Sequence, residues 1–327
     1  MNDRTPQYPP IIKPLPQGET GYVWSVMIPT YNCSKYLKRT IESVLQQDMG
    51  AASMQIEVID DFSTDADVVE QIVHDAGMRR VGFYRQSENV GSLRNFETCI
   101  NRAKGKFIHI LHGDDQVVDG FYTEITALFT KYPEAGAAFT GFSVVNEHDK
   151  FLYNNDTINP QAGIIENWVT TIAENQRLRT CAIVVRRSVY EQLGGFFGVH
   201  YGEDWEMFVR IAANYPVAYS PENFAVYRLH DDNISGRYMA TGQNIKDIKK
   251  VIGIIQNYLP AAKRKAIKKV SLNKFAKYFS GNAQGIYKNH RNGKVALTQA
   301  RGAFLLYPGK DSFFSLVKLY LKVLLRK

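Results

Sequence analysis

The sequence is poor in cysteine and lacks the glycine-rich motifs of common nucleotide sites. Its three cysteines, Cys33, Cys99 and Cys181, lie far apart in a chain of 327 residues. Neither a disulfide framework nor a zinc-ligand spacing is indicated, and a reducing compartment is expected. GxGxxG and GxxxxGK(S/T) are both absent, which disfavours a Rossmann dinucleotide site and a P-loop.

Long apolar segments are missing as well. No stretch reaches the roughly 18 apolar residues that a membrane span requires. Residues 1–20 are polar and rich in proline, without the apolar segment of a signal peptide, and we expect them to form a flexible lead. These absences predict a cytoplasmic protein.

The net charge of +8 hides a strong asymmetry. Residues 246–327 contain nineteen lysines and arginines but only two acids, Asp247 and Asp311, a net charge of +17. That leaves 21 of the 40 basic and 30 of the 32 acidic residues for the rest of the chain, a net charge of −9. A basic tail is expected to seek an anionic surface, either phospholipid or nucleic acid. The basic run at 263–269 (KRKAIKK) lacks interleaved aromatics and known modules, so we expect no nucleic acid partner.

Strands and helices alternate in the first part of the chain. Strands are predicted at residues 22–28, 54–59, 81–85 and 106–111, and helices at 34–46, 65–76, 91–104 and 120–131. This alternation indicates βαβ units, an α/β fold and a mainly parallel central sheet. Further strands are predicted at 137–145, 180–185 and 224–229, and a helix at 203–213. From residue 239 the pattern indicates helices alone, with breaks near Pro260, Gly281, Gly293 and Pro308-Gly309. We therefore predict a domain at 21–238 and a basic helical extension at 239–327.

Polar clusters follow three of the predicted strands. They are PTYN (29–32), DDFSTD (60–65) and HGDD (112–115), with NVGSLRN (89–95) before the last strand. Parallel strands would bring these clusters to one edge of the sheet, where α/β proteins bind ligands. Arg94 could pair with phosphate there, and Gly91 would allow close approach of the backbone. Each cluster alone is also typical of a turn with a helix cap.

The carboxylates of Asp114 and Asp115 suggest a cation. Burying charged groups is costly unless they are paired or bind an ion. A nucleotide site that sets carboxylates near a diphosphate also requires a cation, since the two anions repel each other.

Taken in order, PTYN, VIDDFSTD, NVGSLRN and ILHGDD resemble the motifs of family 2 glycosyltransferases, which have the GT-A fold. The resemblance covers residues 22 to about 235, and residues 25–47 resemble the first strand and helix of that family. It implies a UDP- or GDP-linked sugar donor, Mn²⁺ or Mg²⁺, and inversion at the anomeric carbon. The residues that it places at the nucleotide sugar are Pro29, Thr30, Tyr31, Asn32, Asp60, Asp61, Ser63, Asn89, Gly91, Arg94, His112, Gly113 and Asp115. It makes Asp114 the metal ligand, with His230 reaching the diphosphate or the metal.

His112 departs from the family pattern. It stands where the family's DxD motif has its first Asp. Imidazole suits Mn²⁺ better than Mg²⁺ or Ca²⁺. Alternatively, His112 hydrogen-bonds ribose or phosphate, or satisfies a local backbone carbonyl.

The segment YGEDWEMFVR (201–210) resembles the family's ED motif. It makes Asp204 the general base that removes the proton of the acceptor hydroxyl, and it places Glu203 and Trp205 on the acceptor side, with Trp205 stacked on a sugar. Alternatively, the two acids only favour a helix N-terminus. QxxRW, typical of processive members, is absent, so one sugar per cycle is expected. The resemblance implies a saccharide or lipid-linked acceptor in cell-surface polysaccharide synthesis. A nucleotide- or glycan-binding protein without turnover is the alternative, which the departure at His112 keeps open.

The last predicted helix, 311–327, is basic and amphipathic. Ser315, Lys318, Lys322 and Arg326 share one stripe, and the other residues are mostly apolar. Such a helix could lie on an anionic membrane, which would place the protein on the cytoplasmic face of the membrane. It could equally pack on the domain with its lysines at the negative end of the helix dipole.

Overall fold

The computed structural model describes residues 4–16, 18, 21–230 and 234–325. Two compact units are present. Unit 1 contains Met1–Glu166, Arg177–Gly198 and Asn214–His230, and unit 2 contains Asn167–Gln176, Val199–Ala213 and Asp231–Lys327. Two short segments from before residue 214 thus group with the C-terminal helices, and the predicted division at residue 239 stays a prediction.

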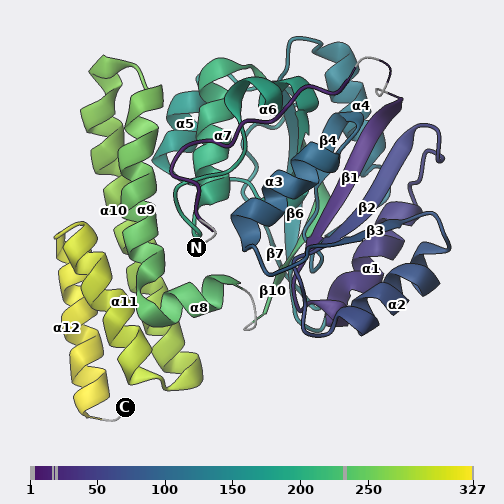
Figure 1. The fold of residues 1–327 in the computed structure, drawn as a ribbon. Helices are drawn as coiled ribbons and strands as arrows, with labels where there is room; N and C mark the ends of the chain where they lie inside the picture. The colour runs from purple at the N-terminus through teal and green to yellow at the C-terminus, as the bar shows by residue number, and fades with distance from the viewer. Residues whose placement is uncertain (1–3, 17, 19–20, 231–233, 326–327) are drawn as a thin grey trace. The chain divides into compact units, whose positions relative to one another are not determined.

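Unit 1 is built on one mixed, mainly parallel sheet (Figure 1). In its parallel part, β1 (Tyr22–Thr30) lies between β2 (Met54–Asp60) and β4 (Gly105–Ile110), and β3 (Gly82–Arg85) pairs with β2. The sheet continues through β9 (Ile183–Arg186), β6 (Ala137–Asn146), β10 (Val217–Leu229) and β5 (Gln116–Val117). The short strands β7 (Phe151–Asn154) and β8 (Gly163–Ile164) pair with β6 and β10. The prediction of an α/β fold with a mainly parallel sheet is confirmed.

The apolar strands are covered by helices of unit 1. These helices are α1 (Ser34–Leu45), α2 (Ala66–Gly77), α3 (Ser92–Arg102), α4 (Phe121–Lys131) and α6 (Arg187–Leu193). Trp24, Val26 and Ile28 of β1 are fully buried against a stripe of α1 that contains Leu37 and Ile41. Strands buried on both faces need such continuous apolar runs.

Some elements differ from those predicted. The segment predicted as a strand at 180–185 begins as the 3-10 helix Thr180–Ala182, and β10 begins at Val217, well before residue 224. The strands β5, β7 and β8 and the helices α5 and α6 were not predicted. A two-residue strand carries no readable period, which explains β5 and β8.

The proline-rich lead is held against unit 1. The N–H of Gly195 donates to the carbonyl of Pro10, and that of Gly198 to the carbonyl of Pro6, both at 2.9 Å. Ile12 is 1% exposed. These contacts tie the described part of the lead, residues 4–16, to unit 1, where the sequence predicts a flexible segment over residues 1–20.

Unit 2 is helical. It contains α5 (Trp168–Glu174), most of α7 (Glu203–Asn214), α8 (Ile234–Thr241), α9 (Gln243–Ile255), the 3-10 helix Gln256–Tyr258, α10 (Ala261–His290), α11 (Gly293–Leu306) and α12 (Lys310–Leu324). The predicted break at Gly281 is wrong, since α10 runs through it and packs against α5, α9, α11 and α12. Within the described part of the chain, no helix is long and apolar enough to cross a membrane. Arg326 of the predicted basic stripe lies outside the described residues.

Candidate functional site

Three polar clusters meet at the carboxyl ends of β1, β2 and β4. Thr30 pairs in register with Asp60, and its carbonyl accepts the N–H of Asp61 at 2.9 Å. On the other side of β1, the carbonyl of Pro29 accepts the N–H of Gly113 at 3.2 Å. The backbone therefore fixes PTYN between DDFSTD and HGDD, as the sequence predicts for parallel strands.

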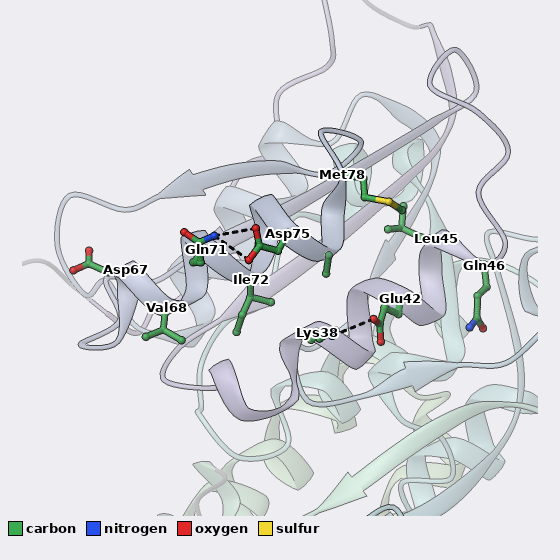
Figure 2. A pocket seen from close by; sticks show the side chains of 11 residues that line it. Lys38, Glu42, Leu45, Gln46, Asp67, Val68, Gln71, Ile72, Asp75 and Met78 are labelled. Carbon is green, nitrogen blue, oxygen red and sulfur yellow. Dashed lines mark hydrogen bonds and ion pairs between the residues drawn. The ribbon is translucent and has the colours of Figure 1, made fainter.

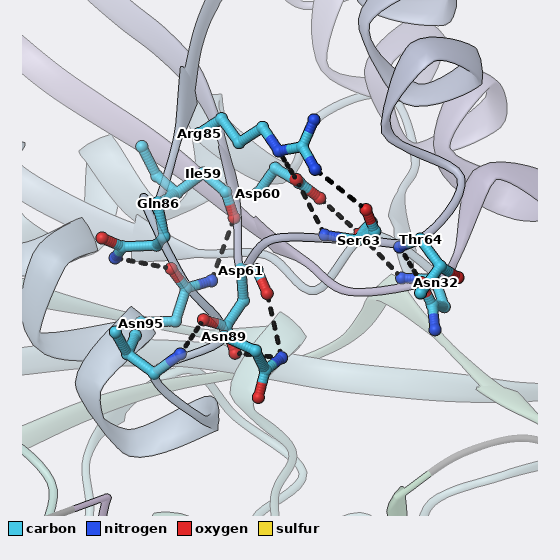
Figure 3. Close-up of polar contacts among 11 residues, drawn as sticks. Asn32, Ile59, Asp60, Asp61, Ser63, Thr64, Arg85, Gln86, Asn89 and Asn95 are labelled. Carbon is cyan, nitrogen blue, oxygen red and sulfur yellow. Dashed lines mark hydrogen bonds and ion pairs between the residues drawn. The ribbon is translucent and has the colours of Figure 1, made fainter. Parts of the chain in front are cut away.

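The turn after β2 is a closed network (Figure 3). Both carboxylate oxygens of Asp60 accept from Ser63, one from its hydroxyl and one from its N–H. The Ser63 hydroxyl also accepts the N–H of Asn32 at 2.9 Å, and Asn32 Oδ1 accepts the N–H of Thr64 at 2.8 Å. Asp60, Ser63 and Asn32 thus satisfy one another, which orders the loop that carries Asp61.

Asp61 holds the loop that precedes α3. One carboxylate oxygen accepts the N–H of Val90 at 2.8 Å. The other accepts the N–H of Gly91 at 2.9 Å and the amide of Asn89 at 3.1 Å. Burial raises the pKa of Asp61 to about 6, opposed by the two backbone N–H groups and by Arg4. Gly91 has φ +87°, a conformation that disfavours any other residue.

Arg4 is part of this site and was not predicted. Its guanidinium donates to the carbonyl of Asn89, and its aliphatic stem lies 3.6–3.7 Å from where a Cβ on Gly91 would stand. No motif marks a single arginine in a proline-rich lead, so sequence reasoning had no signal for it. The lead itself delivers this charge to the edge of the site.

Arg94 and Tyr31 lie beside these loops. Arg94 Nη1 forms an ion pair with Glu97 Oε2 at 2.7 Å, one turn further along α3. Tyr31 is 38% exposed. Both side chains reach solvent, as groups that receive a ligand must.

The loop after β4 holds a possible metal site. Ligand atoms of His112, Asp114 and Asp115 all lie within 4.8 Å of one another. His230, at the end of β10, donates from Nε2 to Asp114 Oδ2 at 2.9 Å. The two carboxylates are ligands that suit Mn²⁺ or Mg²⁺, and a nitrogen ligand beside them is more compatible with Mn²⁺ than with Mg²⁺. The predicted site residues of unit 1 are thus brought to the same edge.

The two carboxyl groups of this loop have opposite tendencies. Burial, reinforced by the charge of Asp114, raises the pKa of Asp115 well above its ordinary range. Burial also acts to raise the pKa of Asp114, but the bond from His230 and the charge of His112 outweigh it and the pKa is lowered. A cation would relieve the repulsion that this pair suffers when both are ionised. The residues present therefore fit a divalent ion.

Gly113 and Arg228 set the shape of this loop. A Cβ on Gly113 would stand 2.6 Å from Thr30 Oγ1 and 2.7 Å from Cys33 Sγ, so only glycine fits. The buried Arg228 donates from its backbone N–H to Asp115 Oδ1 at 2.9 Å and from Nε to the Asp114 carbonyl at 3.0 Å. Arg228 was not predicted, since an arginine within an apolar strand gives no motif.

Unit 2 contains the ED pair at the start of α7. Gln176 donates from Nε2 to Asp204 Oδ2 at 2.6 Å. Burial raises the pKa of Glu203 well above its ordinary range, and the charge of Asp204 adds to this effect. The two carboxyl groups therefore disfavour being ionised together, and Gln176 orients the Asp204 carboxylate.

Trp205 does not form the acceptor platform predicted for it. Its side chain is 0% exposed. Nε1 donates to the carbonyl of Ile172 at 2.7 Å, and its ring packs against Phe275 at 4.8 Å. The helix turns this indole into the core of unit 2, so it anchors α7 and has no face left for a sugar.

A groove between α1 and α2 lies apart from these residues (Figure 2). It has a volume of about 910 Å³ and is lined in part by Leu45, Ile72, Lys38 and Asp75. Its charged side chains are exposed and bond within their own helices, such as Lys38 with Glu42 and Gln71 with Asp75. None of the residues that the resemblance assigns lines it.

Comparison with known families decides the class of the protein. Residues 25–194 match the family model described as glycosyl transferase family 2. This chain belongs to glycosyl transferase family 2. The glycosyltransferase is therefore an enzyme that uses a nucleotide-sugar donor, and the strand-end clusters lie within or next to the matched span.

Solved structures share the fold of this glycosyltransferase. TarS of S. aureus in complex with UDP-GlcNAc has a TM-score of 0.64 at 15% identity, covering 92% of this chain and 90% of that chain. The mannosyltransferase PcManGT of Pyrobaculum calidifontis, in complex with GDP-Man and Mn²⁺, has a TM-score of 0.56 at 15% identity, covering 96% and 91%. The predicted GT-A fold with C-terminal helices is confirmed.

Sequence relatives match different shares of this chain. An uncharacterized protein of Mycobacterium tuberculosis is 26% identical over 70% of this chain and 74% of its own length. GgaB of Bacillus subtilis, a minor teichoic acid biosynthesis protein, is 28% identical over 34% of this chain but 12% of its own length.

Proposed function

We propose that the glycosyltransferase moves one sugar per cycle from a nucleoside diphosphate sugar to an acceptor hydroxyl, with inversion and with the help of a divalent cation. The observation that carries the proposal is the grouping of His112, Asp114 and Asp115 within 4.8 Å beside the loops of Asp61 and Gly113. A nucleotide needs recognition of its base and neutralisation of its diphosphate. This one edge offers groups for both.

On the donor side, the loop held by Asp61 would receive the nucleoside. The cation would be held by Asp114 with His112 or Asp115, and it would stabilise the negative charge of the leaving diphosphate. His230 orients Asp114 through their 2.9 Å bond, as an outer partner of a ligand does. Arg94 would exchange Glu97 for a phosphate oxygen. Neighbours of the same fold hold UDP-GlcNAc or GDP-Man, so uridine and guanosine are the bases to test.

On the acceptor side, Asp204 is proposed as the general base. It would take the proton of the acceptor hydroxyl while that oxygen bonds to the anomeric carbon and the bond to the diphosphate breaks on the opposite face. Gln176 fixes the orientation of the Asp204 carboxylate.

We further propose a saccharide or lipid-linked acceptor of cell-surface polysaccharide synthesis, used at the cytoplasmic face of the membrane. The likeness to a teichoic acid biosynthesis protein over a third of the chain supports this class. A nucleotide- or glycan-binding protein without turnover is the second candidate. The histidine at position 112, in place of an acid, favours it because it lowers the negative charge available to a metal.

Donor hydrolysis and transfer test the proposal. UDP- and GDP-linked sugars would be incubated with the protein in Mn²⁺, Mg²⁺ or EDTA, and nucleoside diphosphate release measured. We expect nucleoside diphosphate release from the sugars of one base only, and no release in EDTA. For Asp204→Asn the rate of release should fall about 10²-fold or more, while donor binding is kept.

Asp119→Asn, an exposed acid near the site, is the matched control and should keep activity. Binding of a donor without release by the wild type under any metal would favour the second candidate. Failure of every nucleotide to bind would refute both.

A further inference from the structure

The outer face of α12 is apolar. Its large hydrophobic side chains that reach solvent are Phe313 (48%), Phe314 (65%), Val317 (39%), Tyr320 (38%), Leu321 (53%), Leu324 (78%) and Leu325 (60%). At helical spacing, positions 314, 317, 321 and 324 form one continuous stripe. Single exposed apolar residues are ordinary, but a contiguous face of them marks an interaction site. We call this set the α12 face.

Two polar side chains of α12, Ser315 and Lys322, are turned toward α10 instead. Gln284 of α10 donates to the carbonyl and the hydroxyl of Ser315 at 2.9 and 3.1 Å. Lys322 Nζ donates to Gln284 Oε1 at 3.0 Å. Leu319, at 0% exposed, is the buried apolar anchor of the helix. The helix thus uses these polar groups for contacts within unit 2 and leaves most of its apolar surface exposed. An ordinary surface helix does the reverse and buries its apolar face.

The neighbouring helix α11 extends the apolar face. Leu305 is 76% exposed, and the Phe304 ring lies 6.0 Å from that of Phe313. Both helices belong to unit 2 and pack against each other (Figure 1). The exposed apolar surface is therefore broader than a single helix, and no single side chain of the protein could cover it.

Cations border the α12 face. Arg301 of α11 lies 5.1 Å from the Tyr320 ring centroid and donates to the Tyr320 hydroxyl. Lys310 and Lys318 are exposed, before and beside the apolar stripe. Asp311, one of two acids after residue 245, is paired with Lys277 at 2.9 Å. The potential around the face is therefore positive, which selects an anionic partner.

We infer that the α12 face is a docking surface for an anionic lipid bilayer. The helix would lie along the membrane with Phe314, Val317 and Leu321 among the acyl chains, while Lys318 and Arg301 extend to the headgroups. A protein partner would need an apolar surface ringed by acids, whereas an anionic bilayer supplies both properties at once. The inference rests on the proposed function for its biological role, which is to bring the enzyme to an acceptor at a membrane. Membrane binding can nevertheless fail while the proposed transfer reaction holds.

Vesicle flotation of the full chain tests the inference. Phosphatidylcholine vesicles with and without about 30% phosphatidylglycerol would be used. We expect binding to the anionic vesicles only, weakened when the salt rises from about 0.1 M to 0.5 M. Phe314→Ser with Leu321→Ser should weaken binding at least about tenfold, and Lys318→Gln about fivefold.

A matched control removes apolar side chains elsewhere. Phe151→Ser with Leu152→Ser, on β7 with 57% and 43% exposure, should leave vesicle binding unchanged. Donor-induced thermal shifts should be unchanged in both double variants, which separates a failed membrane surface from a failed transferase. Absence of wild-type binding, or equal binding by the α12 double variant, overturns the inference. So does a dimer, seen by light scattering, that this variant converts to a monomer, because a second copy would then cover the face.

Discussion

Asp61→Asn is expected to weaken nucleotide binding far more than it weakens the fold. Burial raises the pKa of Asp61 from 3.8 to about 6. At about 1.4 kcal/mol per unit, its charge costs the native state about 3 kcal/mol at neutral pH. Asparagine removes this net cost, but its NH2 group cannot accept an N–H as the second carboxylate oxygen does, so up to two of the three accepted hydrogen bonds are lost, at about 1 kcal/mol each. The two effects nearly cancel, so the free energy of unfolding at pH 7.5 should change by less than about 2 kcal/mol.

The pH dependence gives the reasoning a second test. The unfolded carboxyl loses its proton near pH 3.8 and the folded one near pH 6. Between these values the native state holds a proton that the unfolded state lacks, so this group's contribution to stability falls as pH rises through the window. The asparagine of the variant cannot titrate. The stability of Asp61→Asn relative to wild type should therefore rise by about 2 kcal/mol between pH 4 and pH 7.

Urea unfolding and calorimetric titration with UDP and GDP measure both effects. In wild type, nucleotide affinity should fall as pH drops through about 6, since protonated Asp61 no longer accepts all its N–H groups. At pH 7.5 the variant should bind about ten- to a hundredfold more weakly, the value of a charged hydrogen bond. Asp67 is an exposed acid on α2, and the control variant Asp67→Asn should change neither the nucleotide affinity nor its pH dependence. A variant that binds like wild type, with the same pH profile, would refute a role for the Asp61 loop in donor binding.

Three further predictions follow from single contacts. Arg4→Gln removes a guanidinium whose charge lowers the pKa of Asp61. In calorimetric titrations the variant should therefore lose nucleotide binding at a higher pH than the wild type does. Gly113→Ala places a methyl group within 2.6–2.7 Å of neighbouring side chains; it should cost about 1–3 kcal/mol in urea unfolding and disturb Mn²⁺ binding, and an unchanged midpoint would contradict the close packing. Tyr258→Phe removes the hydroxyl that donates to the buried Glu206 at 2.6 Å. The free energy of unfolding in urea should fall by about 1–3 kcal/mol, and an unchanged value would show that water replaces the bond.

The parallel half of the sheet and its strand-end clusters could be predicted from the sequence. Buried strands such as 22–28 and 106–111 are apolar throughout, and each ends where PTYN or HGDD begins. Because parallel strands share one edge, the pattern predicts proximity without coordinates. In the structure the N–H of Asp61 donates to the Thr30 carbonyl there, and the N–H of Gly113 donates to the Pro29 carbonyl.

Residues that act through long-range contacts could not be predicted. Arg4 reaches the site because Pro6 and Pro10 accept backbone bonds from Gly198 and Gly195, pairings with no local signature. Arg228 sits in an apolar strand and is recognised only by its bonds to the loop of Asp114 and Asp115.

Helix periodicity gives the phase of a stripe but not the side that packs. For α12 it groups Ser315 with Lys322, yet the structure turns both toward Gln284. For α7 it cannot tell that Trp205 faces the core. Gly281 predicts a break from its low helix propensity, and packing of α10 along its length overrides that preference.

The central claim is that the edge of β1, β2 and β4 binds a nucleoside diphosphate through a cation held by Asp114. Calorimetric titration of UDP and GDP in Mn²⁺ and in EDTA, for wild type, Asp114→Asn and the control Asp119→Asn, tests it most directly. The account predicts that one of the two nucleotides binds and that its binding requires Mn²⁺. Asp119→Asn should keep this affinity, and Asp114→Asn should weaken it at least about tenfold. Equal affinity with EDTA, or an Asp114→Asn variant that binds the Mn²⁺ nucleotide as tightly as wild type, would contradict it.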